Sequence, residues 1–142
     1  DLAELKEYNL IKLEKDKKIK KVVLCSGKIY FDLVEAREKI KNNLVFFIRI
    51  EQLYPFPVKT LVKDLKRFRK NAEFYWCQEE PKNMGAWNTA RNYIEWTLNY
   101  IKATNQKVSY IGRDPAASPA TGYARRHMLQ QKEILDKVFS NL

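Results

Sequence analysis

The chain has 142 residues, 45% of them apolar and 13% aromatic, which suffices for one globular domain with a buried core. Its formal net charge of +10 favours anionic partners, but the lysines are spread along predicted helix faces, as in residues 58–70, which argues against nucleic-acid binding. No apolar run reaches the roughly 18 residues of a membrane span, and no signal peptide opens the chain, so we expect no membrane partner.

The first part of the chain is predicted to be a linker. Residues 1–20 mix charged and aliphatic residues without a turn signal, and the lysine run over 15–21 is typical of an exposed connection. Because Asp1 stands where a starting methionine would, we expect a piece of a longer protein. Residues 21–142 are predicted to form a single α/β domain.

Strands and helices then alternate. A strand is predicted over 22–26, and Gly27 ends it before a helix whose apolar positions are Ile29, Leu33, Ala36 and Ile40. A second strand, 44–50, precedes a helix that Pro57 opens and whose apolar face is Val58, Leu61, Val62, Leu65 and Phe68.

The second half repeats the pattern. We expect a third strand over 73–78 and, after Gly85, a helix that turns Ala90, Ile94 and Ile101 inward. A fourth strand is predicted over 107–112. The last helix is expected to begin near Gly122, after a proline-bearing loop over 113–122.

This alternation predicts an α/β fold with three layers: a mainly parallel sheet and helices on both of its faces. Ligands of such folds gather at the carboxyl ends of the strands. The polar residues that we expect at those ends, and therefore treat as candidate site residues, are Ser26, Gly27, Lys28, Arg49, Glu79, Glu80 and Arg113.

The two adjacent glutamates do not fit a two-carboxylate mechanism. On an extended strand Glu79 and Glu80 point to opposite faces, so they cannot share one substrate. The favoured interpretation is that one of them accepts backbone N–H bonds near the start of the next helix. A carboxylate at a strand end can also anchor a neighbouring domain.

The turn Cys25–Ser26–Gly27–Lys28 has the residue types of a phosphate-binding loop, but it lacks the glycine spacing of the Walker and dinucleotide motifs. An ordinary strand-to-helix turn is the favoured interpretation. Lys28, Arg49 and Arg113 could still form a cationic rim at the strand ends, suited to a phosphate or to a partner's acids.

Other reactive residues give no catalytic pattern. Cys25 and Cys77 lie in apolar runs without metal or redox spacing and are predicted to be buried thiols. His127 is the sole histidine, which excludes a multi-histidine metal site within this chain. Trp76, Trp87 and Trp96 are expected to serve core and interdomain packing.

Four stretches carry a family resemblance: KVVLCSGKIYFDL, IRIEQLYPFP, FYWCQEEPKNMGAW and YIGRDPAASPATGYARRH. In this order and spacing they resemble the C-terminal domain of the decarboxylating component of the 2-oxoglutarate dehydrogenase complex, from about Lys21 to the end of the chain. The resemblance implies a fold like the transketolase C-terminal domain.

The resemblance also implies a function. The parent enzyme would be an oxidoreductase of the citric acid cycle that decarboxylates 2-oxoglutarate and passes the succinyl group to the lipoyl arm of the succinyltransferase. Its thiamine diphosphate and Mg would be bound by preceding domains, so no cofactor-binding, catalytic or metal-ligating residue is expected here, and the fragment alone would be inactive. A homodimer in the cytoplasm of a bacterium, or in the mitochondrial matrix of a eukaryote, is implied.

Two uses remain open for the candidate site residues. They could contact the preceding domains or the other subunit through ion pairs of Arg49 with Glu51 or Glu80, which is the favoured use. They could instead bind an acetyl-CoA or nucleotide effector, as in actinobacterial relatives. Two rivals from other classes are a basic module that binds nucleic acid or an acidic protein, and a self-contained enzyme that uses Cys77 and Glu79.

Overall fold

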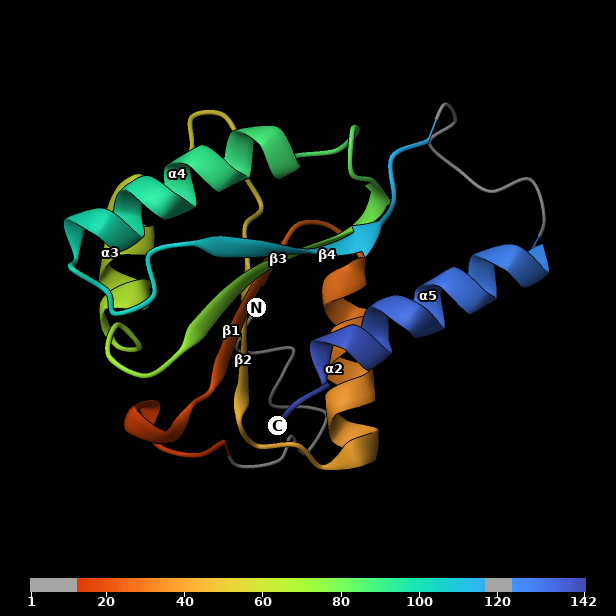
Figure 1. The fold of residues 1–142 in the computed structure, drawn as a ribbon, viewed down its shortest axis with the longest axis horizontal. Helices are drawn as coiled ribbons and strands as arrows, with labels where there is room; N and C mark the ends of the chain where they lie inside the picture. The colour runs from red at the N-terminus through yellow and green to blue at the C-terminus, as the bar shows by residue number, and fades with distance from the viewer. Residues whose placement is uncertain (1–12, 117–123) are drawn as a thin grey trace.

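A computed structural model describes residues 13–116 and 124–142, and in these residues the predicted α/β architecture is confirmed. Four parallel strands form one sheet in the order β2-β1-β3-β4. Helices α3 and α4 cover one face of the sheet and helices α2 and α5 the other (Figure 1). The strands are β1 Lys21–Cys25, β2 Val45–Arg49, β3 Glu73–Pro81 and β4 Val108–Arg113. The helices are η1 Asp16–Lys18 (a single 3-10 turn), α2 Ile29–Ile40, α3 Val58–Lys66, α4 Trp87–Tyr100 and α5 Ala124–Val138.

The sheet separates two cores because successive side chains of a strand point to opposite faces. In the central strand β1, Val22 and Leu24 pack under α3 and α4, whereas Val23 and Cys25 pack under α2 and α5. Every residue of β1 is buried, as expected for a strand that helices cover on both sides. Trp76 and Trp87 are buried in the α3/α4 core, which confirms their predicted packing role, but Trp96 is 54% exposed.

The lysine run before β1 differs from its predicted exposure at two positions. Ile19 and Lys21 are 1% and 5% exposed. At the C-terminal end of α5 the buried Lys21 Nζ donates to the carbonyl oxygens of Val138, the last residue of the helix, and Ser140, at 3.1 and 2.8 Å. A cation satisfies the unpaired carbonyls at a helix C-terminus, so a lysine can be buried there.

Helix α2 departs from its predicted inward face only towards its C-terminal end. Ile29 and Leu33 are buried as expected, but Ile40 is 55% exposed and Arg37 takes an inward position at 5% exposure. The Arg37 guanidinium donates to the Val45 carbonyl at 3.2 Å and lies 4.8 Å from the centre of the Phe47 ring. A hydrogen bond and an aromatic face offset the cost of burying this charge.

The remaining boundaries agree to within a few residues, with one exception. Strand β3 is predicted to end at Gln78 but continues to Pro81, so Glu79 and Glu80 lie within it. The predicted start of the last helix at Gly122 and part of the loop over 113–122 lie outside the described residues, as do residues 1–12 of the predicted linker. No described helix is long and apolar enough to cross a membrane.

Candidate functional site

The carboxyl ends of the four strands meet at one edge of the sheet. Cys25 is in register with both Arg49 and Cys77, and Cys77 is in register with Ile111. The candidate residues that follow these positions therefore lie along the same edge. Gly27 turns the chain from β1 into α2 with a φ of +81°, a conformation that residues with a side chain rarely adopt.

Two other candidate residues, Lys28 and Arg113, contact Glu79. The Lys28 Nζ lies 4.0 Å from a Glu79 carboxylate oxygen, and Arg113 donates from Nε to the Glu79 backbone carbonyl at 2.6 Å. Arg113 also donates to the Gln130 side chain of α5 at 3.3 Å. The Lys28 side chain is 77% exposed and Glu79 only 20%. The Lys28 ammonium is therefore the accessible charge of this group.

Arg49 is held at the end of β2 by aromatic rings and one acid. Its guanidinium lies 5.0 Å from the centre of the Phe31 ring, and its Nη1 is 3.6 Å from a Glu51 carboxylate oxygen. Arg49 and Glu51 thus lie together within this chain, and ion pairs of Arg49 across a domain boundary stay a prediction. The Arg49 Nε is buried and has no hydrogen-bond partner among the described residues.

The two glutamates do not act together, as the strand geometry predicts. Glu79 contacts Lys28 through its carboxylate. Glu80 accepts hydrogen bonds through its backbone carbonyl, from the Tyr110 hydroxyl at 3.3 Å and from the Gln78 amide at 3.1 Å. The expectation that a glutamate accepts an N–H bond at the start of the next helix is wrong, because a neighbouring residue does so.

That neighbour is Gln78, which sequence reasoning missed. Its Oε1 accepts from the Trp76 indole N–H at 2.9 Å and from the backbone N–H of Trp87, the first residue of α4, at 3.1 Å. Its Nε2 donates to the Pro81 and Met84 carbonyls, at 2.9 Å each. Gln78 is 3% exposed and uses both ends of its amide to hold the β3–α4 loop. One sequence feature could have indicated this role: Gln78 is a polar residue at the end of the apolar run 74–77.

Both cysteines are buried and free, as predicted. Burial raises the pKa of the Cys25 thiol to about 12, and it also raises the pKa of Cys77, where Cys25 and Glu79 add to the effect. A thiol is a nucleophile only as the thiolate, so neither group suits covalent catalysis near neutral pH. The rival hypothesis of an enzyme built on Cys77 and Glu79 therefore has no chemical support.

The described residues also bear on metal binding. They contain no group of three or more histidine, cysteine, aspartate or glutamate side chains that could hold a metal ion. His127, on α5, is exposed. The described residues thus offer no ligand cluster for a metal ion, and the binding of Mg by other domains of the parent enzyme stays a prediction.

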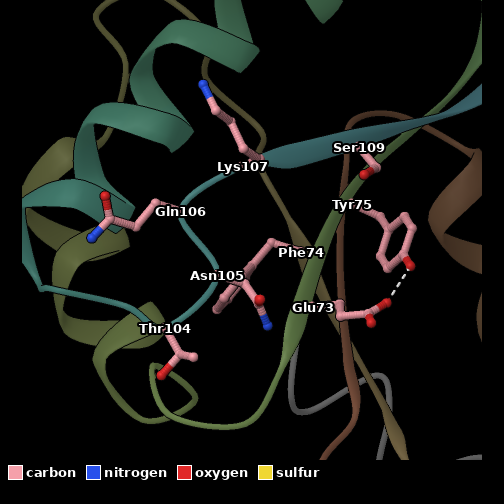
Figure 2. Close-up of a pocket in the computed structure, with 8 residues that line it drawn as sticks. All are labelled: Glu73, Phe74, Tyr75, Thr104, Asn105, Gln106, Lys107 and Ser109. Atoms are coloured by element: carbon pink, nitrogen blue, oxygen red, sulfur yellow. Dashed lines mark hydrogen bonds between the residues drawn. The ribbon is translucent and has the colours of Figure 1, made fainter.

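The described residues also form a polar hollow of about 490 Å³ at the opposite, amino edge of the sheet, away from every candidate residue (Figure 2). Within it the Tyr75 hydroxyl donates to the Glu73 carboxylate at 2.5 Å. Burial and this carboxylate raise the pKa of Tyr75 to about 12, so the phenol stays protonated at neutral pH. The hollow is lined by Glu73, Phe74, Tyr75, Thr104, Asn105, Gln106, Lys107 and Ser109.

Comparisons with known proteins agree with the sequence resemblance. The profile of a family described as "2-oxoglutarate dehydrogenase C-terminal" matches residues 3–139. The chain is 52% identical over 141 residues to the 2-oxoglutarate dehydrogenase E1 component of Brucella anthropi, covering 99% of this chain and 14% of that protein. For the E1 component of Brucella ovis the identity is 54% over 136 residues, covering 96% of this chain and 13% of that protein. The chain thus spans about one seventh of the length of these relatives.

A solved structure supports the fold. A chain described as "Split gene transketolase, inactive beta4 tetramer" matches with a TM-score of 0.52 and 11% identity, over 90% of this chain and 42% of that one. At this identity the likeness concerns the fold alone, and it agrees with the predicted transketolase-like architecture.

Proposed function

The chain belongs to the 2-oxoglutarate dehydrogenase C-terminal family, and we propose that it serves as the C-terminal domain of an enzyme that decarboxylates 2-oxoglutarate and transfers the succinyl group to a lipoyl arm. The observation that carries the proposal is the 52% identity over 99% of the chain with a named E1 component. On this proposal thiamine diphosphate and Mg are bound by other domains of the parent chain.

The carboxyl edge of the sheet is the surface that contacts the preceding domains or the second subunit of a homodimer. Lys28 offers an accessible ammonium there, already oriented by Glu79, and Arg113 is fixed between β3 and α5. These preformed charges suit carboxylates of a neighbouring domain. The domain acts by supporting the catalytic part of the enzyme in the bacterial cytoplasm, or in the mitochondrial matrix of a eukaryote.

A second use of the same edge is supported by one observation. The buried Arg49 Nε lacks a hydrogen-bond partner among the described residues, and an acetyl-CoA or nucleotide phosphate at this edge could supply one. Acetyl-CoA binding by the assembled enzyme that Lys28→Ala and Arg49→Ala leave unchanged would contradict this effector role.

The main proposal is tested with a chimera. The C-terminal segment of the Brucella ovis E1 component that aligns with this chain is replaced by this chain. The chimera, the truncated Brucella protein and the isolated chain are then assayed with 2-oxoglutarate, thiamine diphosphate, Mg and an artificial electron acceptor. We expect activity in the chimera alone. A chimera that folds and binds cofactor but is inactive would contradict the proposal.

A further inference from the structure

The fold gathers most of the net positive charge on one side of the molecule. The sequence predicts a diffuse distribution of lysines, but residues 13–20 and 58–71 together hold ten lysine and arginine side chains and three acids, a net +7 of the total +10. We name the exposed cations of these two segments the basic patch. The prediction of diffuse charge is therefore wrong for this surface.

Two specific contacts join the segments. Arg67, just after α3, donates from Nε and Nη2 to the two carboxylate oxygens of Asp16 in η1, both at 2.9 Å. The Asn71 side chain donates to the Lys17 carbonyl at 2.6 Å. The Arg67 guanidinium also lies against the Phe46 and Phe68 rings, at 5.0 and 4.9 Å from their centres. A bidentate pair on aromatic faces holds η1 against the end of α3, so the two segments form one continuous surface.

The patch is elongated. Lys59, Lys63 and Lys66 are exposed on α3 with a spacing of four and three residues, so they lie along one face of the helix over about 10 Å. The Asp16–Arg67 pair then connects this row to the lysines of η1. Thr104, at the border of the polar hollow, donates its N–H to the Arg69 carbonyl at 2.8 Å, so the hollow adjoins the segment 58–71.

From this geometry we propose that the basic patch is a docking surface for an acidic polypeptide segment of another protein, with carboxylates spaced as on a helix or an extended strand. The row of lysines matches carboxylates at i, i+4 and i+7 on a partner helix. A second copy of this chain that presents the same patch does not fit, because it would bring the same positive charge to the contact. The proposal does not rest on the enzymatic assignment.

The chemistry of the patch disfavours other polyanions. Single-stranded nucleic acid is bound through stacking on exposed aromatic side chains, and the exposed large aromatic residues of the described chain lie outside both segments. Phosphate recognition favours arginine forks, but Arg67 is already engaged by Asp16. The described residues of the two segments also include no exposed large apolar side chain that could enter a lipid surface.

The experiment measures binding of a fluorescein-labelled oligoglutamate peptide to the 142-residue chain by anisotropy. A triple variant, Lys59→Gln, Lys63→Gln and Lys66→Gln, is compared with a matched control, Lys39→Gln, Lys82→Gln and Lys132→Gln, which removes the same charge from exposed positions outside the patch. Circular dichroism verifies that both variants are folded. A labelled single-stranded oligonucleotide of equal charge is titrated in parallel.

We expect the patch variant to bind oligoglutamate about tenfold more weakly than the parent chain and the control variant less than about twofold more weakly. Equal losses in the two variants would overturn the proposal, because binding would then follow net charge alone. Tighter, patch-dependent binding of the oligonucleotide would also overturn it and would assign the surface to nucleic acid.

Discussion

The Nζ atom of Lys21 lies 2.8 Å from the carbonyl oxygen of Ser140, so the first residue of the central strand is bonded to the chain just beyond the last helix. We predict that Lys21→Met lowers the free energy of unfolding by about 1–3 kcal/mol, because the buried Val138 carbonyl loses its donor while the aliphatic packing is retained. Urea denaturation measures the change. Lys20→Met, at the exposed neighbouring position, is the control and should change stability by less than about 0.5 kcal/mol.

We predict that Gln78 contributes more to the stability of the fold than either of the two glutamates that follow it. Gln78→Leu leaves the Trp76 indole N–H, the first N–H of α4 and two loop carbonyls without their partner. We expect a loss of at least about 2 kcal/mol of stability in urea denaturation. The exposed Gln106→Leu is the control. A variant at position 78 as stable as the control would show that water replaces the amide without cost.

Alanine should destabilise the fold more at Gly112 than at Gly27. A Cβ on Gly112 would lie 2.8 Å from the Gln78 carbonyl oxygen and closer still to the Tyr110 hydroxyl, whereas one on Gly27 meets nothing within 4 Å. Gly27→Ala therefore incurs only the strain of a positive φ, about 1 kcal/mol. Gly112→Ala must move strand backbone, and we expect thermal denaturation to rank it as the less stable variant. The reverse order would contradict the close packing at Gly112.

Stability should fall at alkaline pH because of the buried thiols. The folded-state pKa of Cys77 is raised above its unfolded value near 9. The protonated thiol therefore contributes its full stabilisation of the folded state below pH 9, and this stabilisation is lost as the pH rises above 9. One such group lowers the free energy of unfolding by up to about 1.4 kcal/mol per pH unit. We expect Cys77→Ala to have a shallower decline between pH 9 and 11, measured in urea with reductant present. Identical slopes would contradict a protonated buried thiol.

A charge reversal at Lys28 can distinguish a role in contacts between domains from a role in the stability of this domain. Lys28→Glu should leave the stability of the isolated chain within about 0.5 kcal/mol, because the Lys28–Glu79 pair is exposed on the lysine side. In the chimera with the Brucella E1 component we expect the same change to lower activity. Lys39→Glu is the matched control, since Lys39 is similarly exposed and pairs with Glu35 at 3.2 Å. Equal activities of the two variants would contradict a contact at Lys28.

The order of strands and helices could be predicted from the sequence, because the spacing of apolar residues depends on the local backbone geometry. Continuous apolar runs marked β1 and β2, and Leu61 and Leu65 marked the buried face of α3. The sequence could not predict that Lys21 and Arg37 are buried, because their partners are carbonyls distant in the chain or on another element. The role of Gln78 likewise depends on how the β3–α4 loop folds back on the strand.

The sequence predicts where the candidate site lies in the fold, but not which contacts its side chains make. Parallel strands place their carboxyl ends at one edge, which brings Lys28, Glu79 and Arg113 together. That Arg49 also contacts Glu51 within the chain was not foreseen, because sequence spacing does not reveal which way a strand-end side chain turns. The basic patch was missed for a related reason: the Asp16–Arg67 contact joins segments 51 residues apart.

Cys25 and Cys77 lie in register on neighbouring strands, and their reactivity can be used to measure how often the native fold opens. Both thiols lie in the two middle strands of the sheet, covered by α2 and α5. A thiol-specific reagent can reach them only during an opening event that lifts a helix or separates those strands. The rate of labelling of the native chain therefore reads out the frequency of such openings directly, and its dependence on urea distinguishes a local lifting of α5 from complete unfolding.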